Sequence, residues 1–539
     1  MRPDEARRET WRRLLLAALL VGAIALVYLL YNVSRFDRLT NVNAMDYAQI
    51  ARHVLRGEGF TTSFIKPLGL IYHRSVENHP DLSYPPAHIL WTAGMMRLLG
   101  ATDRAVSHSS GLAFLLTVPL MLILAQRLFD WRTAVLGTAI FGTHVANLGY
   151  AVSGLEASLL TLEVTLLILV LYKASAGGRN EMIWVAAAGL IAGVIYMTKY
   201  VWVAGALPVA AYLALMRPER RLARVGLFIA VTVAVSIPWL YRNYHLTGNP
   251  LFTLRAHELI GQTRAFPANS IYRRFSQEIP NYLVFAAGNP RAAFEKARTG
   301  FSTLYSTFHS LGGAFVTPFF LVGVLVRLGN DRVERLRYLV YGMLAAVSIV
   351  LAFVMASPRL VAPLGPIVTI LATFFFWRLL DARLQSTEER ARSRWTALAV
   401  GALMLLHVHP FVTEVTPDEP WYEAGEEPIE TAMQQLHGRV DDVLLTDVPW
   451  QVAWMADMDA VWVPQTTGDL TRLEHAVGRF RWLLLTPAVA RMATPEGLEE
   501  WARLWAQAQQ GDAQYLGFVP AARLGDGRFM LMRRQPERD

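Results

Sequence analysis

Apolar runs separated by short arginine-rich breaks occupy most of the chain up to residue 412. Each run is about twenty residues long, the length that an α-helix needs to cross about 30 Å of hydrocarbon. The pattern therefore predicts an all-α polytopic membrane protein. About eleven spans are expected, at residues 14–34, 107–127, 133–151, 156–173, 182–198, 200–216, 222–242, 311–328, 337–356, 359–379 and 395–412.

The basic residues fall in alternate breaks between these spans. Short cytoplasmic loops carry an excess of lysine and arginine, so this alternation predicts the orientation of the chain. With a cytoplasmic N-terminus, every basic cluster faces inward. The clusters are Arg7, Arg8, Arg12 and Arg13; Arg127 and Arg132; Lys173 and Arg179; Arg217, Arg220, Arg221 and Arg224; Arg327, Arg332, Arg335 and Arg337; and Arg378, Arg383, Arg390, Arg392 and Arg394. The sequence thus predicts a multi-pass membrane protein with a cytoplasmic N-terminus.

Two long exterior loops are expected within the membrane domain 1–412, at residues 35–106 and 243–310. Residues 85–100 of the first loop are short for a span and contain Arg97, so they predict a helix that lies in the interface.

The residues after 412 have a soluble composition. Short β-prone runs alternate with amphipathic helical stretches such as Gly497–Gln509. The sequence therefore predicts a small soluble α/β domain on the exterior, residues 413–539. Its expected strands are Val443–Thr446, Ala460–Pro464, Trp482–Thr486 and Phe529–Met532.

Composition agrees with a membrane protein. Hydrophobic residues make up 53% of the 539 residues and charged residues only 17%, which is outside the usual soluble balance. The net charge of +8 comes largely from arginines between the spans, where they orient the chain, so nucleic-acid binding is not expected. Cysteine is absent, which excludes disulfides, thiol nucleophiles and thiolate metal sites.

One acidic residue stands out in the first exterior loop. The segment NVNAMDYAQIARHVLRGEGF has the periodicity of an amphipathic helix on the membrane surface. We expect Asn43 to cap this helix, which places Asp46 in its first turn. There Asp46 either complements the helix dipole alone or supplies an ionised carboxylate where a lipid phosphate meets water. The local pattern alone favours the dipole interpretation.

Further ionisable residues are expected on the same face of the membrane. Glu156 lies at the mouth of a span in YAVSGLEASL, and His79 and Tyr84 precede the interfacial helix. Three cations stand at other outer turns: Lys199, Arg242 and Arg359. A single cation is commonly explained by snorkelling to the interface. Three cations and two carboxylates on one face together predict an anion site with a nearby base.

Such a combination suits sugar transfer from a lipid phosphate. The acceptor hydroxyl attacks the anomeric carbon through a transition state that resembles an oxocarbenium ion. A carboxylate accepts the hydroxyl proton, and fixed cations stabilise the departing phosphate as its charge grows.

Several motifs in order carry a resemblance to a known group. The chain resembles the GT-C glycosyltransferases over roughly residues 10–380, in particular the family 39-like group. That group includes protein O-mannosyltransferases, the lipid A aminoarabinose transferase and the RgtA/B/C/D-like enzymes. The motifs are DYAQIARHVLRGEGF, HPDLSYPPAHIL, GLEASLLTLEVTLL, MTKYVW, RNYHLTGNPLF and RLVAPLGPIVTILA.

The resemblance implies roles for the residues singled out above. Asp46 would be the catalytic acidic residue and general base, and Glu156 would match the second acidic position. Contacts to the lipid-phosphate donor would come from Lys199, Arg242, Arg359, His79 and Tyr84.

The resemblance also implies the partners: a polyprenyl-phosphate sugar donor, a lipid, glycan or protein acceptor with a free hydroxyl, and the lipid bilayer. The sequence requires no cofactor and shows no metal-ligand cluster. Asn43 and Met45 stand where relatives often carry a second acidic residue, which leaves the use of a divalent metal (Mg²⁺ or Mn²⁺) open.

Two other functions are compatible with a polytopic chain. A transporter or flippase for a lipid-linked sugar predicts ionisable residues at mid-span and symmetric halves, yet Glu163 is one of few mid-span charges and no repeat is evident. A non-catalytic receptor or assembly subunit leaves the outer-face charges unexplained.

Overall fold

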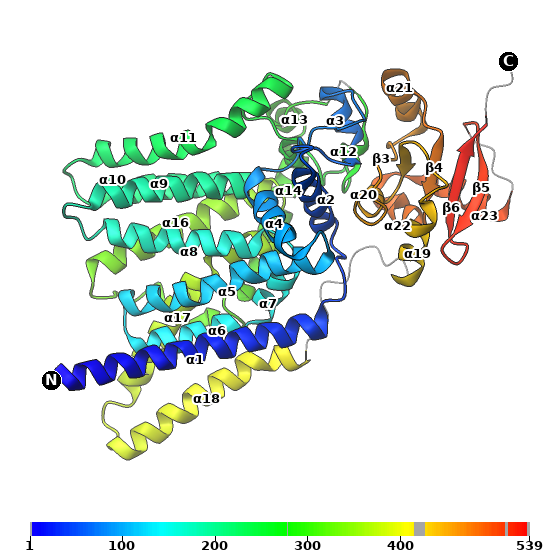
Figure 1. Ribbon diagram of the computed structural model, residues 1–539. Helices are drawn as coiled ribbons and strands as arrows, with labels where there is room; N and C mark the ends of the chain where they lie inside the picture. Colours follow the sequence, from blue (N-terminus) through cyan, green and yellow to red (C-terminus); the bar gives the residue numbers. More distant parts are fainter. Residues whose placement is uncertain (1–2, 277–278, 414–425, 512–515, 536–539) are drawn as a thin grey trace.

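The computed structural model describes residues 3–276, 279–413, 426–511 and 516–535. The chain is a bundle of long helices with a layer of short helices and a small sheet at one end (Figure 1). Seven helices of the described residues are long and apolar enough to cross a membrane, which confirms the expected polytopic class. They are α1 (Pro3–Arg35), α5 (Asp103–Leu128), α8 (Ala157–Ala174), α9 (Glu181–Thr198), α11 (Arg221–Thr247), α16 (Asp331–Phe353) and α17 (Gly365–Arg383).

The other predicted spans correspond to a bent helix pair, to shorter helical segments and to one long helix, α18, that is not among these seven. Helices α6 and α7 meet at 57° and count as an eighth span if they are taken together. The count of eleven therefore stays a prediction. The segments are α6 (Trp131–Thr143) and α7 (Val145–Val152), the 3-10 helix η1 (Tyr200–Gly205) with α10 (Ala206–Leu215), η3 (Phe308–Leu311) with α15 (Thr317–Gly323), and α18 (Glu389–Thr413).

The predicted cytoplasmic clusters lie at the end of the bundle away from the short helices and the sheet (Figure 1). Several of these arginines pair within that end. Arg224 lies 2.7 Å from a carboxylate oxygen of Glu181, and Arg132 lies 2.9 Å from one of Asp381. The grouping agrees with the expected alternation, whereas the side of the membrane on which this end lies stays a prediction.

The opposite end carries the two exterior loops. Their elements pack over the ends of the long helices and against the sheet (Figure 1). The first loop forms α2 (Val42–Arg56), β1 (Phe64–Ile65), α3 (Pro67–Tyr72) and α4 (Pro86–Leu99). The second forms η2 (Leu254–Leu259), α12 (Ser270–Arg273), α13 (Tyr282–Gly288) and α14 (Pro290–Ser306).

Helix α2 differs from the sequence prediction in its start and its surroundings. The capping side chain is that of Asn41, which accepts a hydrogen bond from the amide of Asn43, so Asn43 is not the cap. The helix begins at Val42, and Asp46 therefore lies beyond the first turn, where a dipole effect is weak. Instead of lying on the membrane surface, α2 is packed between α4 and α20 (Pro449–Met455) of the C-terminal region, which sequence periodicity alone cannot reveal.

The C-terminal region forms a mixed sheet with the strand order β1-β3-β2-β4-β6-β5. Four of its strands confirm those expected from the sequence. Residues 414–425, at the start of the predicted soluble domain, lie outside the described residues. The elements are α19 (Glu426–Leu436), β2 (Leu444–Thr446), α20 (Pro449–Met455), β3 (Ala460–Trp462), α21 (Thr467–Val477), β4 (Trp482–Leu485), α22 (Pro487–Glu496), α23 (Glu499–Gln510), β5 (Phe518–Leu524) and β6 (Phe529–Arg534).

Two strands of this sheet were not expected. Strand β5 contains Pro520 at a register irregularity, and proline weakens the β-pattern of a sequence. Strand β1 comes from the first exterior loop and pairs in parallel with β3. The sheet therefore joins two parts of the chain that the sequence assigned to separate domains.

Helices α9 and α11 pack closely because α9 has small residues at its contact face. A Cβ atom at Gly189 would lie 2.7 Å from the carbonyl oxygen of Phe228, and one at Gly193 would lie 2.8 Å from Cβ of Val235. Small residues four positions apart allow two membrane helices to approach each other.

We expect Gly189→Leu to force α9 and α11 apart and to lower the stability of the protein by about 1–3 kcal/mol, the usual cost of overpacking. The melting temperature in detergent measures this loss of stability. Gly226→Leu is the matched control, because a Cβ atom at Gly226 of α11 meets no atom within 4 Å. Equal melting temperatures for the two variants would contradict the prediction.

Candidate active site

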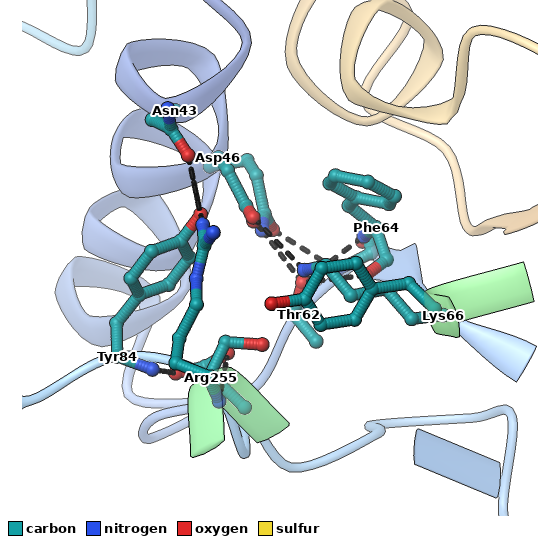
Figure 2. Close-up of polar contacts among 12 residues, drawn as sticks. Asn43, Asp46, Thr62, Phe64, Lys66, Tyr84 and Arg255 are labelled. Carbon is teal, nitrogen blue, oxygen red and sulfur yellow. Dashed lines mark hydrogen bonds and ion pairs between the residues drawn. The ribbon is translucent and has the colours of Figure 1, made fainter. Parts of the chain in front are cut away.

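Asp46 lies at the centre of a buried polar cluster between the first exterior loop and the ends of the long helices. Its side chain is fully buried. The ammonium of Lys66 lies 3.1 Å from Oδ2, and the Gln49 amide donates to Oδ1 at 3.0 Å (Figure 2). A buried carboxylate without such partners would be strongly disfavoured, so Lys66 is the group that allows Asp46 to be charged here.

The segment that carries Lys66 is itself fixed to α2. The Gln49 amide also donates to the hydroxyl of Thr62 at 2.7 Å, and its carbonyl accepts from the amide of Ser63 at 3.0 Å. The Lys66 ammonium lies 4.1 Å from the ring centre of Phe64, a cation–π contact (Figure 2). Sequence reasoning missed Lys66; the signal for it was a lysine directly before a proline-initiated helix in the same loop as Asp46.

A second exterior element meets this cluster through Arg255 of η2. The Arg255 guanidinium donates to Asn43 at 2.8 Å and to the Tyr84 hydroxyl (Figure 2). Arg255 pairs with Glu258 at 2.5 Å. It also lies over the Tyr84 ring, 4.7 Å from the ring centre. Tyr84, which the sequence singled out, therefore belongs to the site, whereas Arg255 was missed because it lies more than 200 residues away in a loop without a clear pattern.

Glu156 and two of the predicted cations form the other side of the cluster. Glu156 directly precedes α8 and is fully buried. Lys199 Nζ lies 2.8 Å from Glu156 Oε1, and a nitrogen of Arg359 lies 3.7 Å from the same oxygen. These three residues come from separate turns between helices, and the structure brings their side chains together, whereas their predicted roles stay predictions.

Tyr47 lies between the Asp46 side and the Glu156 side of the cluster. Burial and the adjacent charge of Glu156 both raise the pKa of the Tyr47 hydroxyl. The Tyr47 ring lies 4.5 Å from the Tyr84 ring between their centres. Since Tyr47 follows Asp46 on α2, both predicted acidic residues border one continuous cluster.

Asp81 is a further carboxylate that sequence reasoning missed. It accepts hydrogen bonds from the amides of Ser83 and Tyr84 at 3.1 and 2.9 Å, so it shapes the turn before α4. Burial raises the pKa of Asp81, and the nearby charge of Asp46 raises it further, whereas Lys66 and Arg242 act in the opposite direction.

Arg242 lies at the edge of the cluster rather than at its centre. Its guanidinium donates to the backbone carbonyls of Phe60 and Asp81 at 2.9 and 3.0 Å, and it stacks over Trp239 at 4.4 Å from the ring centre. These contacts brace the first exterior loop. The predicted role of Arg242 at the lipid phosphate stays a prediction.

His79 also contacts the backbone of the first exterior loop. Its Nδ1 lies 2.8 Å from the carbonyl oxygen of Ser75, and the ring is buried against Gly69 of α3. Burial lowers the pKa of His79 to about 4. His79 is therefore neutral at ordinary pH, which does not favour the predicted contact to an anion.

The cluster as a whole combines groups of both signs and carries one more cation than carboxylates. A buried excess of positive charge favours an anionic ligand. Within the described residues, no group of three His, Asp or Glu side chains converges as metal ligands. The cations are Lys66, Lys199, Arg242, Arg255 and Arg359, and the carboxylates are Asp46, Asp81, Glu156 and Glu258.

An apolar cavity of about 400 Å³ lies between the long helices. Tyr200, next to Lys199, and Thr253, two residues before Arg255, line its polar edge. Its remaining walls come from α8, α9, η1 with α10, α11 and α16, and include Leu167, Ile195, Val209, Val233, Leu240 and Met343. The cavity is therefore an apolar space within the helix bundle, and residues close in sequence to Lys199 and Arg255 contribute to its wall.

Comparison with known proteins identifies a related sequence family and solved structures of similar fold. Residues 83–241 match the sequence model of the dolichyl-phosphate-mannose-protein mannosyltransferase family. A search of curated proteins finds no match to the chain.

Solved structures of similar fold cover nearly the whole chain. ArnT from Cupriavidus metallidurans bound to undecaprenyl phosphate is 15% identical, with a TM-score of 0.57 over 96% of this chain and 99% of that one. The oligosaccharyltransferase AglB from Archaeoglobus fulgidus, in complex with an inhibitory peptide and a dolichol-phosphate, is 11% identical, with a TM-score of 0.57 over 96% and 74%. The A. fulgidus oligosaccharyltransferase in complex with Zn and sulfate is 11% identical, with a TM-score of 0.58 over 90% and 71%.

These findings confirm the resemblance seen in the sequence. The chain has the fold of the GT-C superfamily of membrane glycosyltransferases. It is a multi-pass membrane protein with a small C-terminal α/β region.

The burial of His79 predicts a loss of stability in acid. The unfolded chain binds a proton at the ordinary histidine pKa of about 6.5, whereas the folded protein binds it only near 4. The free energy of unfolding should therefore fall as the pH drops from about 6.5 towards 4, by about 3 kcal/mol from this residue. The free energy of unfolding, measured across that pH range for the wild type and for His79→Gln, gives the contribution of His79 to the pH dependence.

His79→Gln should flatten the pH dependence, because glutamine does not titrate. The exposed His437 provides the control, and His437→Gln should leave the slope unchanged. Identical slopes for wild type and His79→Gln would show that the His79 ring is not held neutral by burial.

Proposed function

We propose that this protein is a glycosyltransferase that moves a sugar from a polyprenyl-phosphate donor to an acceptor hydroxyl at the exterior face of the membrane. The observation that carries the proposal is the buried Asp46–Lys66 pair in a cation-rich cluster beside an apolar cavity. A carboxylate, fixed cations and a lipid-sized apolar space are the three elements that such a reaction requires.

Asp46 is the general base in this proposal. The acceptor oxygen forms a bond to the anomeric carbon while the bond from that carbon to the phosphate oxygen breaks. The electron pair of the broken bond leaves with the phosphate, and the hydroxyl proton moves to Asp46. The Gln49 amide, which donates to Oδ1 at 3.0 Å, orients the carboxylate for this transfer.

The donor phosphate is assigned to the cations nearest Asp46. Lys66 and Arg255 come from different exterior loops and both adjoin Tyr84, so an anion between them would be held from two sides. A phosphate that draws Lys66 towards itself leaves Asp46 free to accept a proton. Lys199 and Arg359 add positive charge from the side of Glu156, the second predicted acidic residue.

The apolar cavity suits the polyprenyl tail. Apolar and aromatic side chains form most of its wall, and Tyr200 and Thr253, which lie within two residues of Lys199 and Arg255 in the sequence, also line it. Burial of isoprene units there contributes about 25 cal/mol for each Å² of apolar surface removed from water.

The relatives support a lipid-linked donor. ArnT was solved with undecaprenyl phosphate, and AglB with a dolichol-phosphate and a peptide. In this proposal the sugar is carried by a polyprenyl phosphate, and the acceptor is a lipid, a glycan or a protein. It places the protein in a bacterial inner membrane with a cytoplasmic N-terminus and the site on the exterior.

We expect Asp46→Asn to lower kcat for sugar transfer by roughly 10²–10⁴-fold, because the amide cannot accept the acceptor proton. Mass spectrometry of cell-envelope glycolipids and glycans, with and without each variant, identifies the product; purified protein then gives the rate. Asp37→Asn in the same exterior loop is the matched control, because Asp37 is exposed.

The same pair of variants separates the alternative functions. Unchanged sugar transfer in a well-expressed Asp46→Asn protein would exclude Asp46 as the base. A wild-type protein that moves a lipid-linked sugar across the bilayer without forming a new glycosidic bond would support the transporter instead.

Lys66→Met should weaken donor binding as well as slow transfer, because it removes a cation from the proposed phosphate site. A loss of 1.5–3 kcal/mol, typical of hydrogen bonds to charged groups, corresponds to a rise in KM for the donor of roughly 10- to 100-fold. Arg74→Met is the control, since Arg74 is exposed in the same loop. An unchanged donor KM in a folded Lys66→Met protein would place the phosphate elsewhere.

A further inference from the structure

The segment that presents Lys66 is a strand of the C-terminal sheet. In β1, Phe64 and Ile65 pair in parallel register with Ala460 and Val461 of β3. The amide of Ala460 donates to the carbonyl oxygen of Ser63 at 2.8 Å. Lys66 follows the last residue of this two-residue strand, so its backbone position depends on the pairing.

Side chains strengthen the same contact. The Ser63 hydroxyl donates to Oδ1 of Asp459 at 2.6 Å and lies 3.2 Å from Nε2 of His53. The Phe64 ring packs edge-on against Trp450 and Trp462, with ring centres 5.9 and 5.4 Å apart. Phe64 is also the ring over which the Lys66 ammonium lies. The C-terminal region therefore fixes both the backbone and the aromatic partner of Lys66.

The helix that carries Asp46 is held by the same region. Arg52 of α2 donates to the backbone carbonyls of Ala453 and Trp454 at 2.6 and 3.0 Å, at the end of α20. Arg52 and Arg56 also both pair with Asp457, at 2.9 and 2.5 Å. The two members of the Asp46–Lys66 pair thus lie on separate segments, each of which is anchored to the C-terminal region.

We propose that the C-terminal region is a positioning device for the catalytic pair, in which Asp459 and strand β3 hold residues 62–66 so that Lys66 reaches Asp46. A two-residue strand has no stability of its own and exists only where a neighbouring sheet provides the pairing. Displacement of a catalytic group by about 1 Å can cost roughly 100-fold in rate. This inference rests on the proposed function.

The test uses the full-length protein and the Asp459→Ala variant, which removes the acceptor for the Ser63 hydroxyl. Asp459→Asn keeps an oxygen at that position and should restore the wild-type behaviour. Asp442→Ala is the matched control in the same region: Asp442 is exposed, accepts a hydrogen bond from the adjacent Val443 amide at 2.8 Å, lies 3.8 Å from Arg481, and makes no contact to residues 60–68 that the structure records. Ser63→Ala removes the same hydrogen bond from the other side, should Asp459→Ala fail to fold.

Two measurements are made on each variant. Hydrogen–deuterium exchange of the peptide spanning residues 60–68 should be faster in Asp459→Ala and Ser63→Ala than in wild type, Asp459→Asn and Asp442→Ala. Steady-state kinetics should show kcat/KM for the donor lowered by roughly tenfold or more in the first two variants only, with a raised donor KM. A purely structural role of Asp459 would lower the amount of folded protein without changing the donor KM.

Unchanged exchange in residues 60–68 of both folded variants would overturn the inference, as would faster exchange with unaltered kinetics. The hydrogen–deuterium exchange measurement does not depend on sugar transfer. If the wild-type protein transfers no sugar, the proposed function fails, while the exchange measurement still decides whether the C-terminal region orders the segment that carries Lys66.

Discussion

One constraint governs the arrangement of this structure: charged side chains that are buried beside the apolar helix bundle must be stabilised there. A carboxylate or ammonium removed from water is costly unless an opposite charge and hydrogen bonds accompany it. The protein meets this requirement with a pair at Asp46 and Lys66 and a second pair at Glu156 and Lys199. The elements that surround these pairs are arranged so that residues from distant parts of the chain arrive together at the outer end of the bundle.

Sequence patterns predicted the polytopic class of the membrane part because that class follows one-dimensional rules, whereas the count of the spans and their orientation stay predictions. Span length and the alternation of basic breaks do not depend on distant contacts. The order of outer turns also placed Glu156, Lys199 and Arg359 on one face, and these three side chains do meet. The bent α6–α7 pair and the short η1 helix were not foreseen, since a long apolar run does not show where its helix breaks.

The parts of the site that could not be predicted are those formed by contacts between exterior loops. Lys66 lies twenty positions after its partner, and Arg255 more than two hundred positions after Asn43. Asn41 caps α2 although Asn43 has the same side chain, because the choice between them depends on where the chain enters from α1. Arg242 and His79 had the right chemistry for an anion, yet backbone carbonyls are their partners in the structure.

The parallel pairing of β1 with β3 has a consequence for biosynthesis. About four hundred residues separate the two strands, so the first exterior loop emerges long before its partner strand is made. Contacts so distant in sequence form late in folding because loop closure must precede them. Insertion of the helices can proceed from the N-terminus onward, but the end of the bundle that carries the polar cluster is completed only after strand β3 has been made and has paired with β1. A nascent or truncated chain would therefore be inserted in the bilayer with its polar cluster still open to water.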